Sequence, residues 1–379
     1  MKIALVHDFL KEYGGAERVL EALHEIWPEA PVYTSFLLAK KLPDHFKSWD
    51  IRESYLRKLP LISKIGKIFT FFYPWIFESL DLSEYDVIIS STASFAKGII
   101  TKPNQLHVCY CHTVPRFLYH YPTETNRRQL WYLKPGLAIW DHWLRVWDFW
   151  AAQRVDEFVV NSCEVKRRVS KFYRRTSAVI HPSVDLKRFT PTANSQQPTT
   201  VSGKQSADSY FLVVSRLSAY KNIDLAVWAC NQLKANLKIV GVGREEVKLR
   251  KIAGSTVEFL GSVPDKKLVS YYRNSKAVIF PSEDDFGIVP IEAMACGKPV
   301  IALAKGGALE TIIQHSTGEF FAKPDIDSLI NVLKYFEPEK YSPDACRKQA
   351  GKFSKEQFEK KIKDFVEDKW QKYNQINKH

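Results

Sequence analysis

The sequence of 379 residues contains no apolar run of the ~18–20 residues that a transmembrane helix needs. Its first apolar run, within residues 1–9, is too short for a secretory signal peptide and reaches an aspartate at position 8. The six cysteines form no C-x-x-C pair and no zinc-like spacing with histidine, which argues against a structural zinc site and a redox motif. These absences predict a cytoplasmic protein with free thiols.

Recognisable nucleic-acid modules are also missing, although the chain is basic. It carries 55 Lys and Arg against 42 Asp and Glu, which gives a formal net charge of +13. The excess is local, because residues 52–67 hold five basic side chains against one acidic, and residues 163–175 hold six against one. Without a DNA or RNA motif beside these clusters, we expect no nucleic-acid partner. An anionic membrane or a phosphate-bearing substrate stays open as the reason for the charge.

What the sequence does contain is a strand–helix rhythm that runs through each half of the chain. The length suits two domains, since single hydrophobic cores stop growing near ~250–300 residues. Continuous apolar runs followed by helical patterns predict parallel sheets covered on both faces. We place an N-terminal domain at 1–189, a polar linker at 190–208, a C-terminal domain at 209–352 and a closing helix at 353–379.

The predicted fold class is therefore α/β, with two doubly wound domains that face a central cleft. Ligands of such sheets bind at the carboxyl ends of the strands, so the cleft is where we expect the site. In the last segment, Phe358, Ile362, Phe365 and Trp370 fall on or near one stripe of a helix. That stripe predicts a helix that closes back on the N-terminal domain.

Two cations follow the first apolar strand of the second half. Arg216 comes directly after this strand, and Lys221 lies five residues later, before a helical run. Side-chain cations at the carboxyl end of a strand suit a diphosphate, and arginine can contact two oxygens at once. An isolated pair of this kind is also compatible with two solvated surface charges.

A second motif is an acidic turn at the start of a helix. Glu283 and Asp284 precede Phe286 and Gly287, and Glu292 lies on the helix that follows. A Phe-Gly turn at a helix N-terminus exposes N–H groups that can hold an anion or sugar hydroxyls, and carboxylates suit sugar diols. Completion of the helix dipole would explain the acids, but it would not explain the glycine.

The N-terminal half offers weaker signals of the same kind. Gly14 and Gly15 open a predicted helix, and their small size permits close backbone approach to a phosphate, although the pattern is not G-x-G-x-x-G. His112 follows a predicted strand, which places it at the carboxyl edge of the sheet. A lone histidine is more often structural than catalytic, so His112 becomes a candidate only through this position.

In this order, the motifs resemble the retaining family 4 glycosyltransferases, which have the GT-B architecture of two Rossmann-like domains. The resemblance runs from GGAERV at 14–19 to GGALETI at 306–312. Within the family, HPSVDLKRF at 181–189, SRLSAYKNIDLAV at 215–227 and EDDFGIVPIEAMACGKPVIA at 283–302 look most like bacterial mannosyltransferases. Those enzymes use GDP-mannose in the synthesis of surface polysaccharides.

The resemblance implies roles for individual residues. Arg216 and Lys221 would bind the donor diphosphate, and Glu292, the second acid of the family's Glu-x₇-Glu signature, would hold the ribose hydroxyls. Asp284 occupies the first acid position, with Glu283 one place earlier, and we favour Asp284 as the residue that reaches the sugar. Gly287 and Ile288 would present backbone N–H groups to the hexose, and Glu283, Phe286 and Val289 are further candidates for binding the donor. Gly14 and Gly15 would approach the phosphates or acceptor, His112 the transferred sugar, and Val263 the base.

The resemblance also implies the reaction and its partners. We expect hexosyl transfer with retention, no metal and no cofactor, because two cations and helix N-termini can neutralise the departing diphosphate. GDP-mannose is the favoured donor and a saccharide or lipid-linked saccharide the acceptor, in cell-surface polysaccharide synthesis. Alternatives are a UDP- or ADP-sugar donor and, less well supported, a nucleotide-sugar epimerase of the same architecture. A non-enzymatic nucleic-acid-binding protein is disfavoured.

The acceptor side has two aromatic segments. Residues 61–72 predict an amphipathic helix, with apolar side chains within one arc of ~120° and lysines opposite. With its flanks, 52–77, it is a candidate contact with an anionic membrane at the inner face, although packing into the domain fits equally well. Residues 131–150 carry five tryptophans, which either line an acceptor or lipid site or form an aromatic core.

Overall fold

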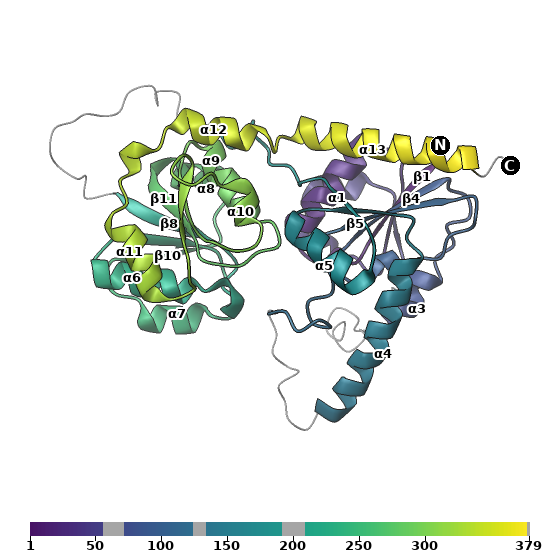
Figure 1. Cartoon of the computed structure of the whole chain (residues 1–379), viewed down its shortest axis with the longest axis horizontal. Coiled ribbons are helices and arrows are strands. Elements are labelled where there is room, and N and C mark those ends of the chain that lie inside the picture. Colours follow the sequence, from purple (N-terminus) through teal and green to yellow (C-terminus); the bar gives the residue numbers. More distant parts are fainter. Residues whose placement is uncertain (56–71, 124–133, 192–208, 377–379) are drawn as a thin grey trace. The chain divides into compact units, whose positions relative to one another are not determined.

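The computed structural model describes residues 1–55, 72–123, 134–191 and 209–376 (Figure 1). These residues divide into an N-terminal unit, formed by 1–182 together with 358–379, and a C-terminal unit, formed by 183–357. The predicted helix at 61–72 lies outside the described residues except for Phe72, and so does the linker beyond residue 191. None of the helices within the described ranges has the length and apolar character that crossing a membrane requires.

Within the described ranges, the sheet of the N-terminal unit has seven strands, all parallel. They are β1 (Ile3–His7), β2 (Val32–Thr34), β3 (Ile51–Glu53), β4 (Val87–Thr92), β5 (Leu106–Cys111), β6 (Glu157–Val160) and β7 (Ala178–Val179). Every residue of β1, β4 and β5 is buried, as expected for central parallel strands covered on both faces. The strand order β3-β2-β1-β4-β5-β6-β7 reverses between β1 and β4.

Helices cover both faces of this sheet. On one face, Leu5 of β1 packs with Leu20 and Ile362, and on the other Val6 packs with Leu144. The helices are α1 (Gly15–Ile26), α3 (Tyr73–Glu78), α4 (Lys134–Gln153), α5 (Cys163–Tyr173) and α13 (Lys355–Ile376), with 3₁₀ turns η1 (Ala39–Lys41), η2 (Asp44–Ser48) and η5 (Ala96–Gly98). The predicted closing helix is α13, and it packs on the N-terminal unit beside α1 (Figure 1).

The C-terminal unit repeats this plan with six parallel strands in the described ranges. They are β8 (Tyr210–Val214), β9 (Leu237–Val240), β10 (Val257–Gly261), β11 (Ser275–Phe280), β12 (Val300–Leu303) and β13 (Gly318–Phe321). The order β10-β9-β8-β11-β12-β13 reverses between β8 and β11. This alternation of strands and helices is the rhythm that the sequence predicts for the second half, and β13 lies at one edge of the sheet.

Helices also sandwich the second sheet. On one face Leu212 packs with Ile291, and on the other Val213 packs with Ala226 and Leu329. The helices are α6 (Ile223–Leu233), α7 (Glu246–Ile252), α8 (Asp265–Asn274), α9 (Ile288–Ala295), α10 (Ala308–Thr311), α11 (Ile326–Lys334) and α12 (Pro343–Gly351), with 3₁₀ turns η8 (Ala219–Lys221) and η9 (Pro338–Lys340). The predicted doubly wound fold is confirmed in both units.

The boundary between the units differs from the predicted one. Residues 183–189, which we assigned to the first domain, belong to the C-terminal unit. Val184 and Phe189 are buried in its core, and the Val184 N–H donates to the carbonyl of Phe353 at 2.9 Å. Arg347 of α12 further donates to the carbonyls of Leu186 and Phe189. The apolar side chains of this short segment are therefore buried in the C-terminal unit, and the boundary between the units lies before the polar stretch that predicted the linker.

Candidate functional site

Two loops meet where the strand order of the C-terminal sheet reverses. Arg216 and Lys221 follow β8, and residues 281–287 follow its neighbour β11. In open parallel sheets, ligands bind outside the carboxyl ends of the strands at such a reversal. The motifs singled out in the second half of the sequence therefore lie together, at the edge of the sheet where a ligand is expected.

Lys221 and Asp284 form an ion pair at this edge. The Nζ atom of Lys221 lies 2.7 Å from Oδ1 and 2.5 Å from Oδ2 of Asp284, and the side chains are 12% and 17% exposed. The contact joins the loop after β8 to the loop after β11. An ammonium group held in this way, with one side open to solvent, is well placed to bind a phosphate oxygen beside the carboxylate.

Arg216 lies on the same edge but is exposed to solvent. Its Nη2 atom donates to the Tyr220 hydroxyl at 3.4 Å. The backbone beside it packs closely on the turn after β9, where a Cβ atom on Gly241 would lie only 1.9 Å from the carbonyl oxygen of Ser215. Glycine at 241 thus lets the loop that carries Arg216 approach β9. Sequence reasoning missed this support, although the two glycines in VGVG after a strand were the available signal.

The Phe-Gly turn begins α9 as predicted. Gly287 precedes the helix with a φ of +86°, and a Cβ atom there would lie 2.8 Å from Cζ of Phe280, so a side chain would be both strained and crowded. Phe286 is buried in the core against Phe353, with ring centroids 5.8 Å apart. The side chain of Phe286 therefore anchors the turn, and its expected contact with a ligand is limited to the backbone.

The acids of the signature have different surroundings. Glu292 is 3% exposed and accepts a hydrogen bond from the Tyr272 hydroxyl at 2.8 Å. Glu283 is 45% exposed and lies 3.9 Å from Nζ of Lys305, whereas Asp284 pairs with Lys221. Geometry thus places Asp284 rather than Glu283 beside the predicted phosphate-binding lysine.

The remaining predicted residues of this unit lie around the same core. Val263 follows β10, and Ile288 and Val289 begin α9, and all three are partly buried against the core cluster that contains Phe286. The N–H of Gly307, at the start of α10, donates to the carbonyl of Asp284 at 3.0 Å. Gly307 belongs to the GGALETI motif and fixes the backbone of the acidic turn, a role that we did not assign from the sequence.

In the N-terminal unit, Gly14 and Gly15 begin α1 next to the reversal between β1 and β4. The N–H of Gly14 donates to Oε2 of Glu17 at 3.0 Å, in the manner of a capping box. This N–H, which we expected to face a phosphate, is therefore used inside the protein. Gly15 is the first residue of α1, and its contact with a phosphate or acceptor stays a prediction.

His112 belongs to a chain of buried polar side chains that sequence reasoning did not find. Its Nε2 atom lies 2.8 Å from Oγ of Ser91, and the same Oγ lies 3.2 Å from Nδ1 of His7. The Nε2 atom of His7 is 3.9 Å from Oε1 of Glu17. The chain Glu17–His7–Ser91–His112 thus links the start of α1 to the carboxyl ends of β1, β4 and β5.

Electrostatics assign the protons along this chain. The carboxylate of Glu17 favours a proton on Nε2 of His7, so Nδ1 of His7 accepts from the Ser91 hydroxyl. The oxygen of Ser91 then accepts from Nε2–H of His112, which leaves Nδ1 of His112 as a lone-pair acceptor. Burial, and secondarily the nearby His7, lower the pKa of His112 to about 3, so the ring is neutral at pH 7. Because the unfolded chain binds this proton first, His112 disfavours the folded state as pH falls from about 6.5 towards 3.

Among the residues that the structure describes, no three His, Cys, Asp or Glu side chains converge as metal ligands would. Asp325 and Asp327 form an Asp-x-Asp pair at the start of α11. Asp325 caps this helix by accepting from the N–H of Ser328 at 2.8 Å. The pair thus has a local structural role.

Comparison with known families covers both units. A model described as "Glycosyltransferase Family 4" matches residues 13–188, and a model described as "Glycosyl transferases group 1" matches residues 197–353. The first match includes Glu17, Ser91 and His112 of the polar chain, and the second includes the Lys221–Asp284 pair. Between them, the two models span most of the chain.

Individual relatives of the chain are also glycosyltransferases. An alpha-1,3/1,6-mannosyltransferase of Neurospora crassa is 26% identical over 67% of this chain and 65% of its own length. A GDP-mannose-dependent phosphatidylinositol monomannoside mannosyltransferase of Corynebacterium glutamicum is 33% identical over 40% of this chain and 44% of its own. The chain thus spans less than two thirds of these relatives. A crystal structure of Anabaena HepE with UDP and glucose shares the fold, with a TM-score of 0.69, 19% identity and coverage of 97% and 99%.

Proposed function

Since the chain belongs to glycosyltransferase family 4, with a group 1 glycosyl transferase domain in its second half, we propose that it transfers mannose from GDP-mannose to a saccharide acceptor. The observation that carries the proposal is the Lys221–Asp284 pair at the reversal of the C-terminal sheet. The mannosyltransferase relatives support the hexose, and the donor named for the Corynebacterium relative supports the base.

Charge neutralisation is the main task of the donor site. Breaking the bond between the anomeric carbon and the diphosphate oxygen leaves positive charge on the sugar and negative charge on the leaving group. Lys221 and Arg216 stabilise the departing diphosphate, and Asp284 lies where it can face the sugar. Two side-chain cations do here the work that a divalent metal does in other transferases, so the proposed reaction needs no metal.

The other predicted residues orient the donor and the acceptor. Glu292 holds the ribose hydroxyls, the backbone of Gly287 and Ile288 holds the hexose, and His112 accepts from a sugar hydroxyl through Nδ1. The acceptor hydroxyl attacks from the side of the leaving group, so the new bond retains the configuration. The proton of the acceptor passes to the departing phosphate oxygen.

We further propose a saccharide or lipid-linked saccharide acceptor in the synthesis of cell-surface polysaccharide. This assignment rests on the likeness of the motifs at 181–189, 215–227 and 283–302 to bacterial mannosyltransferases. A lipid-linked acceptor would require the enzyme to work at a membrane surface. The basic clusters of the N-terminal half are compatible with that location.

Thermal melting with a panel of donors tests the proposed function. Because a ligand of the native state raises the melting temperature, GDP-mannose should stabilise the protein more than UDP-glucose, UDP-GlcNAc or ADP-glucose do. At about 100 times the dissociation constant the gain is ~2.7 kcal/mol. Stabilisation by a UDP-sugar alone would reject GDP-mannose as donor. Stabilisation by DNA and by no nucleotide sugar would reject the transferase itself.

A substitution at Ser91 tests the role of the buried polar chain. Ser91→Ala removes the partner of both histidines, so we expect kcat to fall about tenfold, the effect of losing one orienting hydrogen bond of ~1.4 kcal/mol. The dissociation constant for GDP should stay unchanged, because its proposed site lies in the other unit. Nitrogen-15 NMR of the imidazole rings should show that His112 loses its single tautomer.

The same strand provides a matched control. Ser90 is also buried and lies 2.8 Å from Nε2 of His107, on the opposite face of β4. Ser90→Ala therefore removes an equivalent bond without touching His112, and it should leave kcat and the His112 tautomer as they are. Equal losses of kcat in both variants would reduce Ser91 to a structural residue.

A further inference from the structure

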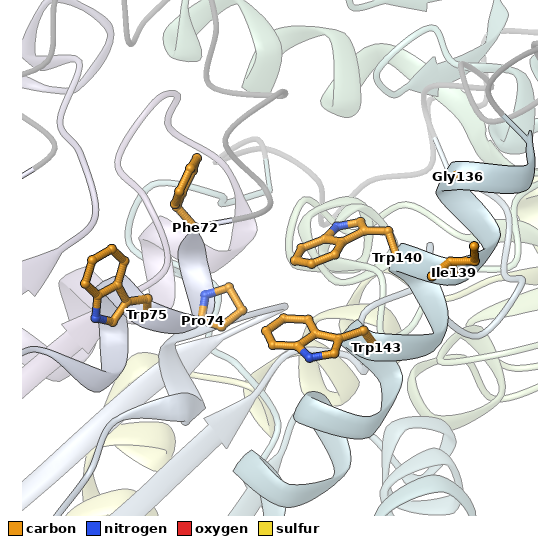
Figure 2. Close-up of a pocket in the computed structure, with 7 residues that line it drawn as sticks. All are labelled: Phe72, Pro74, Trp75, Gly136, Ile139, Trp140 and Trp143. Carbon is orange, nitrogen blue, oxygen red and sulfur yellow. The ribbon is translucent and has the colours of Figure 1, made fainter.

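An aromatic pocket of about 630 Å³ lies in the N-terminal unit, and its lining includes no residue of the polar chain at His112. Figure 2 shows Pro74 opposite Trp140 and Trp143 of α4, with Phe72 and Trp75 beside Pro74 at the start of α3 and Ile139 beside Trp140. The rings of Trp140 and Trp143 stack with centroids 4.8 Å apart. Apart from the indole N–H groups, the lining side chains have no polar atom. A pocket of this size and character suits hydrocarbon.

The apolar surface around the pocket continues along α4. Ile139, Trp143, Val146 and Trp150 follow one another at intervals of four, three and four residues, which places them on one stripe of the helix. Their side chains are 75%, 47%, 46% and 61% exposed. Trp75 and Phe72, across the pocket, are 64% and 41% exposed. Contiguous apolar surface of this kind marks an interaction site.

Helix α4 buries apolar side chains such as Leu144 on its inner face, and it exposes large apolar side chains on its outer face as well. Its inner face holds Asp148, which is fully buried and lies 2.5 Å from Nζ of the buried Lys97. Surface helices of water-soluble proteins bury apolar side chains and expose charged ones. The outer face of α4 instead carries the four large apolar residues of the exposed stripe, so it is suited to an apolar partner.

The residue types favour a lipid bilayer as that partner. Tryptophan accumulates at the boundary between headgroups and acyl chains, where its apolar ring and polar N–H are both satisfied. The chain segments that lead into Phe72 and into α4 add charge of the matching sign. Residues 56–71 contain four basic side chains and no acidic one, and residues 124–135 contain three basic and one acidic. Anionic lipid headgroups attract such segments.

The other basic cluster is less available than its sequence indicated. Arg168 of α5 is 2% exposed and donates to Glu164, and Arg175 donates to the carbonyls of Gln153 and Asp156. Part of the charge at 163–175 is therefore used inside the N-terminal unit. This finding shifts the expected membrane contact to the surface formed by α3 and α4.

We propose that this aromatic surface, Phe72, Trp75, Ile139, Trp143, Val146 and Trp150, docks the protein on an anionic bilayer with the tryptophans at the level of the headgroups. The docking deepens the proposed function, because it would bring the transferase to a lipid-linked acceptor. It also replaces a general expectation for 52–77 with named side chains on two helices.

Binding of the full chain to vesicles tests the proposal. We expect cosedimentation with vesicles of phosphatidylglycerol and phosphatidylcholine, and weaker binding to phosphatidylcholine alone. Trp75→Ser combined with Trp143→Ser should weaken binding at least ~10-fold, the effect of keeping one large side chain out of the bilayer. Lipids brominated in the acyl chains should quench tryptophan fluorescence of the wild type and much less that of the double variant. Since Trp75 is 64% and Trp143 47% exposed, the variant should change its melting temperature little.

Trp228→Ser is the matched control, because Trp228 is 40% exposed but lies on α6 of the C-terminal unit. Equal binding by the wild type and the double variant would overturn the proposal. Dimers seen by sedimentation velocity, and lost in the double variant without a change in vesicle binding, would assign the surface to a second copy instead. Donor-induced melting shifts without vesicles report on the proposed function separately, so each can fail alone.

Discussion

Replacing Lys221 with alanine should lower kcat at least ~10²-fold, the size of losing one donor that stabilises charge in the transition state. Lys221 is the ammonium group held against Asp284 at the strand reversal of the C-terminal sheet. Negative charge on the diphosphate rises as the sugar leaves, so the loss should appear mainly in kcat and less in KM. Initial rates of the proposed reaction, mannose transfer from GDP-mannose, measure it. Arg216→Ala should behave in the same way.

Controls come from cations of the same unit. Lys248 and Arg250 lie on α7, are largely exposed and pair with Glu245 and Glu246. Their alanine variants should keep wild-type rates, since exposed pairs of this kind contribute little. Near-normal turnover in both Lys221→Ala and Arg216→Ala would contradict the assignment of the diphosphate site.

Asp284→Asn separates the two halves of the ion pair. Without the carboxylate, the charge of Lys221 is no longer neutralised, so free GDP should bind about threefold to tenfold more tightly. Transfer should nevertheless slow, because the group proposed to face the sugar is lost. Weaker GDP binding in this variant would show that Asp284 supports the nucleotide rather than the sugar.

The C-terminal part of the site could be predicted from the sequence because its motifs are local. Arg216, Lys221 and Asp284 each follow a recognisable buried strand, and parallel strands end at one edge of a sheet. Position after a strand does not separate Glu283 from Asp284, and only the spacing of the family signature favoured Asp284. In the structure, Gly307 holds the backbone of the turn through the carbonyl of Asp284. The side chain of Asp284 then contacts Lys221, whereas that of Glu283 lies near Lys305.

The rest depends on tertiary packing that no local pattern records. The polar chain at His112 joins Glu17, His7 and Ser91, which lie far apart in the sequence and meet only because β1, β4 and β5 are neighbours. Phe286 was a donor-binding candidate from the resemblance, and no local pattern indicated that its ring would be buried in the core. From the sequence, the five tryptophans at 131–150 were compatible with an aromatic core or with a binding surface. Helix α4 has tryptophans of both kinds, because Trp147 is buried and Trp150 is exposed.

Replacing Lys97 with methionine should destabilise the N-terminal unit by about 3–5 kcal/mol, because Asp148 would keep a buried charge without its partner. Lys97 and Asp148 are 1% and 0% exposed, and the Tyr119 hydroxyl donates to the same carboxylate at 2.9 Å. For a unit of this size the melting temperature should fall by roughly 6–20 °C, as calorimetry can measure.

Combining Lys97→Met with Asp148→Leu should restore most of the loss, since an apolar pair can replace a buried ion pair. Lys372→Met, which breaks an exposed pair with Asp368 on α13, should change the melting temperature little. If the double variant melts as low as Lys97→Met, packing rather than uncompensated charge explains the loss. If the melting temperature of the double variant is restored and the variant still binds anionic vesicles, the buried pair serves only to stabilise α4. The outer face of α4 is then sufficient for docking.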